Sequence, residues 1–184
     1  TTNGVAWKKP IGAMDITSMG GGAALYATET PISLTRCEFR ANRGIAGDDY
    51  YERAIVALAN TNTDRPWTCG ITNCLFVGNE LPSQSAKFTS LSSGALSIND
   101  TTRQRTAEIV NCTFAYNIAN ATTGAAGLSV KAGDVKVRNS VFYGNRQIST
   151  ATQGSDIFVT KAGASADVDY SFVTSLEEAN VAAV

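Results

Sequence analysis

The residue types that perform chemistry are sparse in this chain of 184 residues. It contains no histidine, which excludes nucleophile pairs of the Ser-His and Cys-His type and the commonest zinc sites. The carboxylates Asp48 and Asp49 are neighbours in one segment, whereas a glycoside hydrolase needs two carboxyl groups ~5–10 Å apart across a cleft. The sequence therefore predicts no catalytic residue, no metal site and no cofactor.

Three basic residues leave a polysaccharide lyase as an alternative, because a Lys or Arg base serves such enzymes, often beside Ca²⁺ held by clustered carboxylates. They are Lys131, Lys136 and Arg138. The carboxylates that accompany them are scattered rather than clustered: Asp134, Asp156 and Asp167. A polysaccharide-active enzyme, either lyase or hydrolase, is therefore kept as the second hypothesis.

Charge and composition narrow the class of protein. Lys and Arg number 15 and Asp and Glu 16, a net charge of −1, so no basic excess exists to attract nucleic acid. Ala, Thr, Gly, Ser and Asn supply 26, 21, 16, 15 and 13 residues, about half of the chain. Thr and Asn are poor helix formers, and no apolar run reaches the ~18 residues of a membrane span. We expect turn-rich β structure without a membrane span.

One segment recurs and organises the chain. Its copies are ISLTRCEFRAN (32–42), CGITNCLFVGN (69–79), AEIVNCTFAYN (107–117), VKVRNSVFYGN (135–145) and a degenerate ADVDYSFVTS (166–175). Their apolar positions lie two, then three, then two residues apart, which indicates two short strands joined at a corner. A third strand precedes each copy, in ALYA (24–27), VAL (56–58), ALSI (95–98), GLSV (127–130) and DIFV (156–159).

Three strands and three turns per copy predict one coil of a parallel β-helix, with coils stacked ~4.8 Å apart. We expect an all-β fold of about five coils over residues 20–175, inside a single domain 1–184. Residues 1–19 would be an N-terminal cap or an incomplete coil, and residues 176–184, which begin like a short helix, a C-terminal tail or cap. Both segments could instead lead into further coils or an anchoring domain of a longer precursor.

Equivalent positions of stacked coils contact each other, so a recurring residue forms a ladder along the stack. Phenylalanine recurs as Phe39, Phe76, Phe114 and Phe142, and asparagine follows three residues later as Asn42, Asn79, Asn117 and Asn145. We expect buried, stacked rings in the first ladder. In the second we expect amides that bond the turning backbone.

The four cysteines occupy inward columns of the same repeat. Cys37, Cys74 and Cys112 share a column with Ser140 and Ser171, whereas Cys69 takes an apolar position. An even number of cysteines in a secreted chain favours disulfides. The alternation with serine instead favours four free, buried thiols, because the column needs only a small side chain.

We expect binding residues in the turns, because loops carry function on a rigid scaffold. The turns are longest around residues 43–54, 59–68 and 80–93. The first contains acidic and aromatic residues that suit a protein or glycan contact, and the second contains a tryptophan that either covers a corner or stacks on a sugar. The candidate binding residues are Asp48, Asp49, Tyr50, Tyr51, Arg53 and Trp67.

The combination of FxxN with Gly-rich segments resembles a known repeat. FxxN occurs at the four Phe and Asn pairs, and GGA[ILV]-like segments occur at Gly21-Gly22-Ala23-Ala24, Ser93-Gly94-Ala95-Leu96 and Ala126-Gly127-Leu128. Over about residues 20–175 the chain resembles the polymorphic outer membrane proteins of chlamydiae and, more broadly, bacterial surface proteins with right-handed parallel β-helix repeats. The resemblance implies a β-helical autotransporter passenger that acts in adhesion at the bacterial outer membrane.

These features predict a non-catalytic, secreted or cell-surface module that binds protein or glycan and no nucleic acid. The alternatives are the polysaccharide-active enzyme and a self-associating structural surface protein. Self-association follows from the open ends of a β-helix, which are unpaired strand edges.

Overall fold

The structure, a computed structural model, describes residues 21–44, 52–60, 63, 67–81, 93–103, 106–120, 124–148, 156–160, 163–174, 176–178 and 181–183. Every regular element in these ranges is a β-strand, and every strand pairing is parallel. The predicted all-β class is therefore confirmed for this part of the chain. Within it, no helix is present that is long and apolar enough to cross a membrane.

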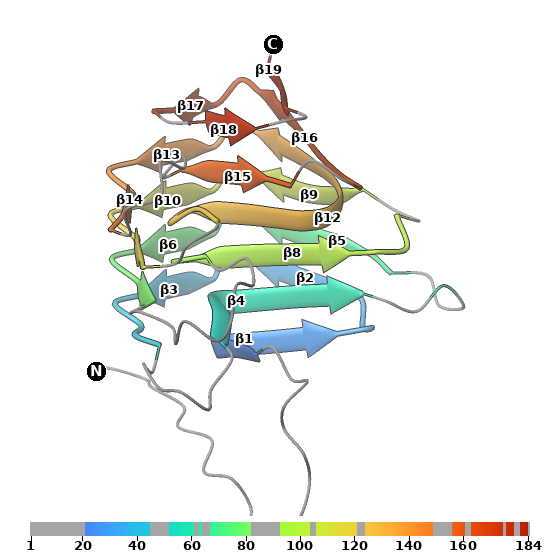
Figure 1. The fold of residues 1–184 in the computed structure, drawn as a ribbon, viewed down its shortest axis with the longest axis horizontal. Coiled ribbons are helices and arrows are strands. Elements are labelled where there is room, and N and C mark those ends of the chain that lie inside the picture. The colour runs from blue at the N-terminus through green and yellow to red at the C-terminus, as the bar shows by residue number, and fades with distance from the viewer. Residues whose placement is uncertain are drawn as a thin grey trace, which may run out of the picture.

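The strand that precedes each copy of the repeat belongs to a first sheet, sheet A (Figure 1). Its members are β1 (Gly21–Thr28), β4 (Glu52–Asn60), β8 (Leu96–Asp100), β12 (Leu128–Arg138), β15 (Ile157–Val159) and β18 (Leu176–Glu178). The first half of each copy forms sheet B. Its members are β2 (Ile32–Thr35), β5 (Cys69–Thr72), β9 (Ala107–Val110), β12, β16 (Ala164–Asp169) and β19 (Val181–Ala183).

The second half of each copy forms sheet C. Its members are β3 (Glu38–Arg40), β6 (Leu75–Val77), β10 (Thr113–Ala115), β13 (Val141–Tyr143) and β17 (Phe172–Val173). A fourth, narrow sheet follows the FxxN asparagine and was not predicted. This sheet D contains β7 (Glu80–Leu81), β11 (Ile118–Ala119) and β14 (Arg146–Gln147).

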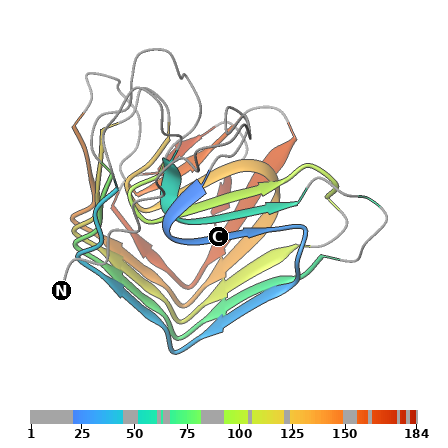
Figure 2. The same cartoon turned by 90° about the horizontal axis from the view of Figure 1, so that it is seen from below.

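The chain visits the sheets in the same order in each copy, so that like strands lie beside like strands. Viewed along the stack, sheets B and C form the two arms of a V, and sheet A lies across its open side (Figure 2). β12 is long enough to run through both sheet A and sheet B, which joins them into one sheet of 11 strands. The space between the three sheets is filled by one hydrophobic core.

The predicted inward columns are confirmed by register and burial. In sheet B, Leu34 pairs with Ile71 and Ile71 with Ile109, and all three side chains are buried. In sheet A, Val56 and Leu58 pair with Leu96 and Ile98, and these side chains are buried as well. Two-residue alternation therefore identified the core face of both sheets, because one face of each strand is turned inward.

The phenylalanine ladder is a column of nearly parallel rings. Ring centroids of Phe39 and Phe76 lie 4.9 Å apart, and those of Phe76 and Phe114, and of Phe114 and Phe142, lie 4.5 Å apart. Phe76, Phe114 and Phe142 are completely buried, while Phe39 is half-buried. The in-register strand spacing of ~4.8 Å sets the ring spacing, so stacking follows from the backbone.

The asparagine ladder runs along the corner after sheet C. The Oδ1 atom of Asn117 accepts from the backbone N–H and the side-chain amide of Asn79, at 3.0 and 2.8 Å. The Nδ2 atom of Asn117 donates to the carbonyl of Phe76, at 2.9 Å, and to Oδ1 of Asn145, also at 2.9 Å. Each amide thus satisfies backbone groups that the corner would otherwise leave unpaired inside the molecule.

The Cys/Ser column forms a second hydrogen-bonded ladder, at the corner between sheets B and C. The backbone N–H of Cys74 donates to Sγ of Cys112, at 3.4 Å, and the N–H of Cys112 donates to Oγ of Ser140, at 3.1 Å. Sγ of Cys112 in turn donates to the carbonyl of Val110, at 3.3 Å. The column therefore requires a side chain that both accepts and donates a hydrogen bond. This requirement explains why cysteine and serine share the column, and small size alone is an incomplete explanation.

The same corner fixes the backbone in the left-handed region one residue earlier. φ is 55° at Asn73, 53° at Asn111 and 47° at Asn139. Asparagine tolerates this region better than other residues with a side chain, so the recurring asparagine before the Cys/Ser column is a conformational requirement. Arg36 and Tyr170 hold the same position in the first and last copies, with φ of 55° and 47°.

One expectation about the chain ends of the repeat is corrected. Residues 176–178 and 181–183 form strands and not the start of a short helix, because β18 pairs with β15 and β19 pairs with β16 in further parallel pairings. Unpaired backbone groups at the edge of a sheet outweigh the weak helix propensity of so short a segment. Residues 1–19 lie outside the described residues.

The thiols are free, as predicted, but not all are buried. No disulfide joins Cys37, Cys69, Cys74 or Cys112, and the last three are buried. Cys37, in the first copy, is half-buried, and its backbone N–H donates to Sγ of Cys74.

We predict that Phe114→Ala lowers the free energy of unfolding by roughly 3–5 kcal/mol, because it opens a cavity in the middle of the ring column. Urea denaturation measures the loss. Glu108→Ala, on the exposed face of β9, is the control and should stay within about 0.5 kcal/mol of the wild type. Equal stability of the two variants would contradict the inward placement of the phenylalanine ladder.

We predict that Cys112→Ser is tolerated within about 1 kcal/mol, because the hydroxyl repeats the bonds that Ser140 makes. Cys112→Ala should cost about 1–3 kcal/mol more than Cys112→Ser, since it leaves the buried N–H of Cys74 without an acceptor. Thermal and urea unfolding of both variants measure the difference in their free energies of unfolding. If alanine is the better substitute, the column is only an apolar position.

Candidate functional site

Large apolar side chains are exposed on the outer surface of sheet C, in the second half of the repeat. Val141 and Tyr143 of β13 are 41% and 48% exposed, and Phe172 of β17 is 54% exposed. Tyr116, in the turn after β10, is 58% exposed. We call these four residues the aromatic face. Contiguous exposed apolar surface on a soluble protein is typical of a contact site.

The short strands of sheet C place these side chains outward. Each strand centres on the inward phenylalanine position, so the residues on either side of it point away from the core. Val141 pairs with Phe172 and with Thr113, and Tyr143 pairs with Ala115. The equivalent outward positions of the first strand of the sheet hold Glu38 and Arg40, so the apolar character belongs to the later copies.

Tyr116 reaches the aromatic face because its neighbour in the next copy is a glycine. A Cβ atom at Gly144 would lie 2.8 Å from a ring carbon of Tyr116, so a side chain there would displace the ring from this position. The rings of Tyr116 and Tyr143 meet edge to face, with centroids 5.5 Å apart. This contact orders two exposed tyrosines, and a rigid aromatic anchor loses little entropy when it binds a partner.

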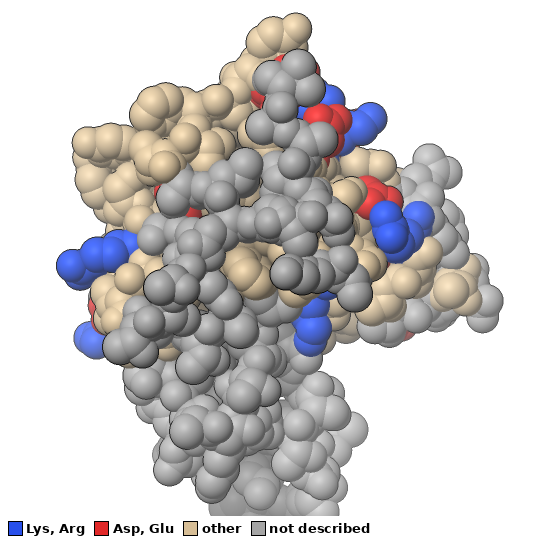
Figure 3. Space-filling view, turned by 45° about the horizontal axis from the view of Figure 1, so that its top comes forward, with Lys and Arg blue, Asp and Glu red and all other residues tan. Residues whose placement is uncertain are grey.

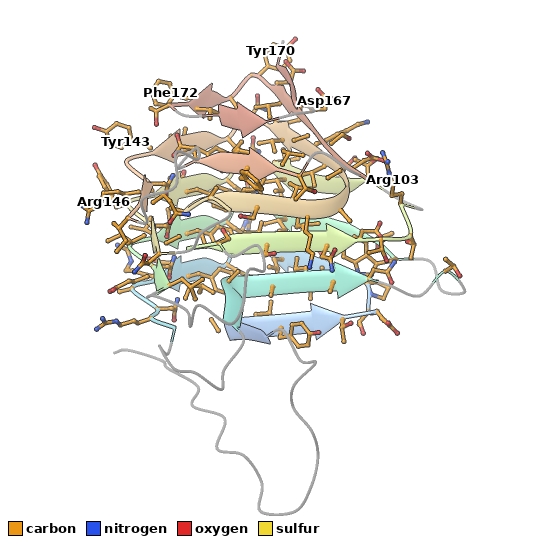
Figure 4. The ribbon with its side chains drawn as sticks, in the orientation of Figure 1. Arg103, Tyr143, Arg146, Asp167, Tyr170 and Phe172 are labelled. Carbon is orange, nitrogen blue, oxygen red and sulfur yellow. The ribbon has the colours of Figure 1, made fainter. Side chains whose placement is uncertain are left out.

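Polar groups border the aromatic face. Figure 4 shows Tyr143, Arg146 and Phe172 projecting from the same side of the molecule, with Arg103 and Asp167 on the opposite side. Arg146 lies on β14 and is exposed, and Ile148 beyond it is 47% exposed. In Figure 3 the charged side chains form small separate groups, and the upper left part, where β13 and β17 lie, is uncharged surface. An apolar centre with a polar rim is the usual anatomy of a protein interface.

The binding residues predicted from the sequence are not brought together by the described structure. Asp48, Asp49, Tyr50 and Tyr51 lie outside the described residues, and of Arg53 only the backbone, in β4, is described. Trp67 is 2% exposed and belongs to the hydrophobic core. Of the two alternatives for Trp67, its burial agrees with a residue that covers a corner and not with one that stacks on a sugar.

The basic residues of the lyase hypothesis lie on sheet B and its border with sheet A. Nη2 of Arg138 donates to Oδ2 of Asp167, at 2.8 Å, and its Nε lies 3.5 Å from Oδ2 of Asp169. The bond to Asp167 raises the pKa of the Arg138 guanidinium, which makes it a poorer base. Lys136 lies in register between Glu108 and Asp167, so opposite charges alternate along this outer face.

The buried thiols have low reactivity. Burial first, and then the charge of Asp100, raises the pKa of Cys69 to about 12. Burial likewise raises the pKa of Cys112 to about 11, with backbone hydrogen bonds opposing it. Because the thiolate is the reactive form, these thiols are poor nucleophiles at neutral pH.

The aromatic face could have been found from the sequence. Sequence reasoning used the period of two to locate inward residues and did not apply it to the residues between them. Val141 and Tyr143 flank Phe142 directly, so the same rule places them outside. What the sequence does not reveal is that Tyr116 lies beside them, which depends on the pairing of β10 with β13.

No family model matches the chain, and no curated protein or solved structure is significantly similar to it. Among the described residues, no group of three or more His, Cys, Asp or Glu side chains is placed to hold a metal ion. The candidate functional site is therefore defined by its geometry alone, as an exposed aromatic surface on a rigid parallel sheet.

We predict that the native protein exposes at most one rapidly reacting thiol, that of Cys37, because the other three are buried and the raised pKa values keep Cys69 and Cys112 protonated. Titration with a chromogenic disulfide at pH 8 measures the reactive thiols. All four should react after denaturation. Rapid reaction of three or four thiols in the folded protein would contradict the burial described above.

Proposed function

We propose that this chain is a right-handed parallel β-helix that serves as a non-catalytic binding module of a secreted or cell-surface protein. Its partner is a protein or a glycan, bound at the aromatic face. The single observation that carries the proposal is the exposure of Tyr116, Val141, Tyr143 and Phe172 on one outer surface.

The β-helical arrangement is supported by the repeated order of strands. Each copy contributes a strand to sheet A, then to sheet B, then to sheet C, and pairs in parallel with the copies before and after it. Stacked phenylalanines and asparagines at the same place in four successive copies support it further. A stack of this kind offers long flat surfaces whose side chains repeat at the strand spacing.

Binding is supported by the kind of residue that the aromatic face displays. Tyrosine combines a large apolar ring with a hydroxyl and is enriched where proteins contact partners. Rings on neighbouring in-register strands form a flat surface on which a sugar ring or an extended peptide can lie. Arg146 at the border supplies a hydrogen-bond donor that suits a carboxylate or hydroxyl group of the partner.

A location outside the cell is supported by the composition and by the repeat. Low charge and abundant Thr, Ser, Asn and Ala give a neutral polar surface, and FxxN repeats resemble those of bacterial surface proteins. The segment from Asp48 to Arg53, whose last two residues belong to β4, remains a competing binding edge, because it combines acids with aromatic rings.

We predict that the double variant Tyr143→Ala/Phe172→Ala weakens partner binding at least tenfold, because it removes two exposed apolar anchors. The wild type is first applied to an array of glycans and immobilised extracellular proteins, and Kd for the strongest partner is then measured by biolayer interferometry. Tyr26→Ala is the matched control, since Tyr26 is a 40% exposed tyrosine on sheet A. It should leave Kd unchanged.

Replacement of Asp48 through Tyr51, the part of this segment that precedes β4, by a Gly-Ser loop completes this experiment. Binding that survives in the double variant but is lost on loop replacement would place the site at that loop and overturn the aromatic face. Release of unsaturated product from uronic-acid polysaccharides, followed by absorbance, would overturn the non-catalytic assignment itself.

A further inference from the structure

Two polar side chains replace apolar ones at the end of the inward column of sheet A. Asn60 is the last residue of β4 and Asp100 the last of β8, and they lie opposite each other in register. Their exposed fractions are 0% and 1%. Two residues earlier, Leu58 and Ile98 point into the core, so by alternation Asn60 and Asp100 point inward too.

The hydrogen bonds of this pair leave two oxygens unused. Nδ2 of Asn60 donates to Oδ1 of Asp100, at 3.1 Å, and to Oγ1 of Thr102, at 2.9 Å. Oδ1 of Asp100 also accepts from the backbone N–H and the hydroxyl of Thr102, at 3.1 and 2.6 Å. Oδ1 of Asn60 and Oδ2 of Asp100 are buried and have no hydrogen-bond partner in the structure.

Among the described residues, the carboxylate also has no positive partner. No ion pair involving Asp100 occurs among the described residues, and the nearest arginine in the sequence, Arg103, binds Asp134 instead, at 2.6 Å and with half-exposed side chains. A buried carboxylate without a counter-charge is far more costly than a hydrogen-bonded neutral group. A buried polar atom without a partner indicates an ion or a water that completes it.

The corner around Asp100 is closely packed on the side of the next copy. A Cβ atom at Gly133 would lie 2.9 Å from Cβ of Asp100 and 3.0 Å from its carbonyl oxygen. The backbone of Gly133, with φ of 94°, therefore fits against Asp100 only because it has no side chain. Asn99 also has an unpartnered Oδ1, but alternation turns it to the other face of β8, so it is not part of this corner.

We propose that this corner between sheets A and B binds a divalent cation that prefers oxygen ligands, of the calcium type, through Oδ2 of Asp100 and Oδ1 of Asn60. Carboxylate and amide oxygens are the usual protein ligands of Ca²⁺, and carbonyl oxygens or waters complete its coordination. A site with a single carboxylate binds weakly, with Kd on the order of 10⁻⁴–10⁻³ M, which is the range of extracellular calcium modules. The proposal does not depend on the function of the aromatic face.

Calorimetric titration and thermal unfolding test this site on the whole chain, after treatment with a chelator and dialysis. CaCl₂ should bind with about one ion per chain, and a hundredfold excess over Kd should raise Tm by about 5–10 °C. MgCl₂ and NaCl at equal ionic strength are the salt controls and should shift Tm less. The same titration of Asp134→Asn should match the wild type, because Asp134 is a partly exposed aspartate whose carboxylate binds Arg103 and Ser165 and not Asn60 or Asp100.

Two variants at the corner give opposite expectations. Asp100→Asn keeps the shape and the acceptor Oδ1 but loses the charge, and it should lose the calcium-dependent rise in Tm. Asn60→Asp adds a second carboxylate, and it should unfold at a lower temperature in chelator yet bind Ca²⁺ about tenfold more tightly. The proposal is overturned if neither Ca²⁺ nor Mg²⁺ produces heat or a Tm shift in the wild type, or if Asp100→Asn keeps the wild-type response. In either case a water molecule completes the two oxygens.

Discussion

Parallel hydrogen bonding in register between successive copies of the repeat is the constraint on which the rest of the structure depends. It places each side chain beside its own equivalent, ~4.8 Å away, through every copy. Only residues that tolerate a copy of themselves can therefore fill the interior. Phenylalanine rings stack, and asparagine, serine and cysteine can each donate and accept, as the bonds from Asn79 to Asn117 and from Cys74 to Cys112 show. Apart from the buried Asp100 and Asp156, the described charged side chains lie on the outer faces, where Lys136 lies between two acids.

The same constraint explains how the asparagine ladder ends. Nδ2 of Asn145 donates to Oδ1 of Asp156, at 2.7 Å, and Oδ2 of that buried carboxylate accepts from the N–H and hydroxyl of Thr174. A carboxylate accepts but does not donate, so it cannot pass the chain of side-chain bonds to a further copy. After it the chain enters β18 of sheet A with no strand of sheet D in between, within the described residues. The interior is thus specified residue by residue, and the outer faces of the sheets are free to carry function.

Sequence reasoning succeeded where a property depends on spacing alone. Three of the strands in each copy, the inward columns and the free cysteines all follow from the period of two and from the alignment of copies, whereas the short strands of sheet D were missed. It failed where tertiary pairing decides. Residues 176–178 have helix-forming side chains yet pair as a strand with β15. The sequence also left open whether Trp67 covers a corner or stacks on a sugar, and only the fold shows that it is buried in the core. The unpaired oxygens of Asn60 and Asp100 could not be anticipated either, because their residues lie 40 positions apart and meet only through the register of β4 and β8.

The central claim, that equivalent residues of successive copies lie directly against each other, is tested most directly by nuclear Overhauser effects between phenylalanine rings in a selectively labelled sample. The account predicts ring-to-ring contacts from Phe76 to Phe114 and from Phe114 to Phe142, and none from Phe76 to Phe142, because the neighbouring rings lie 4.5 Å apart in a single column. Assignment by single Phe→Leu variants identifies each contact. Absence of both sequential contacts in the folded protein, or a direct contact that skips Phe114, would contradict the stacked, in-register arrangement.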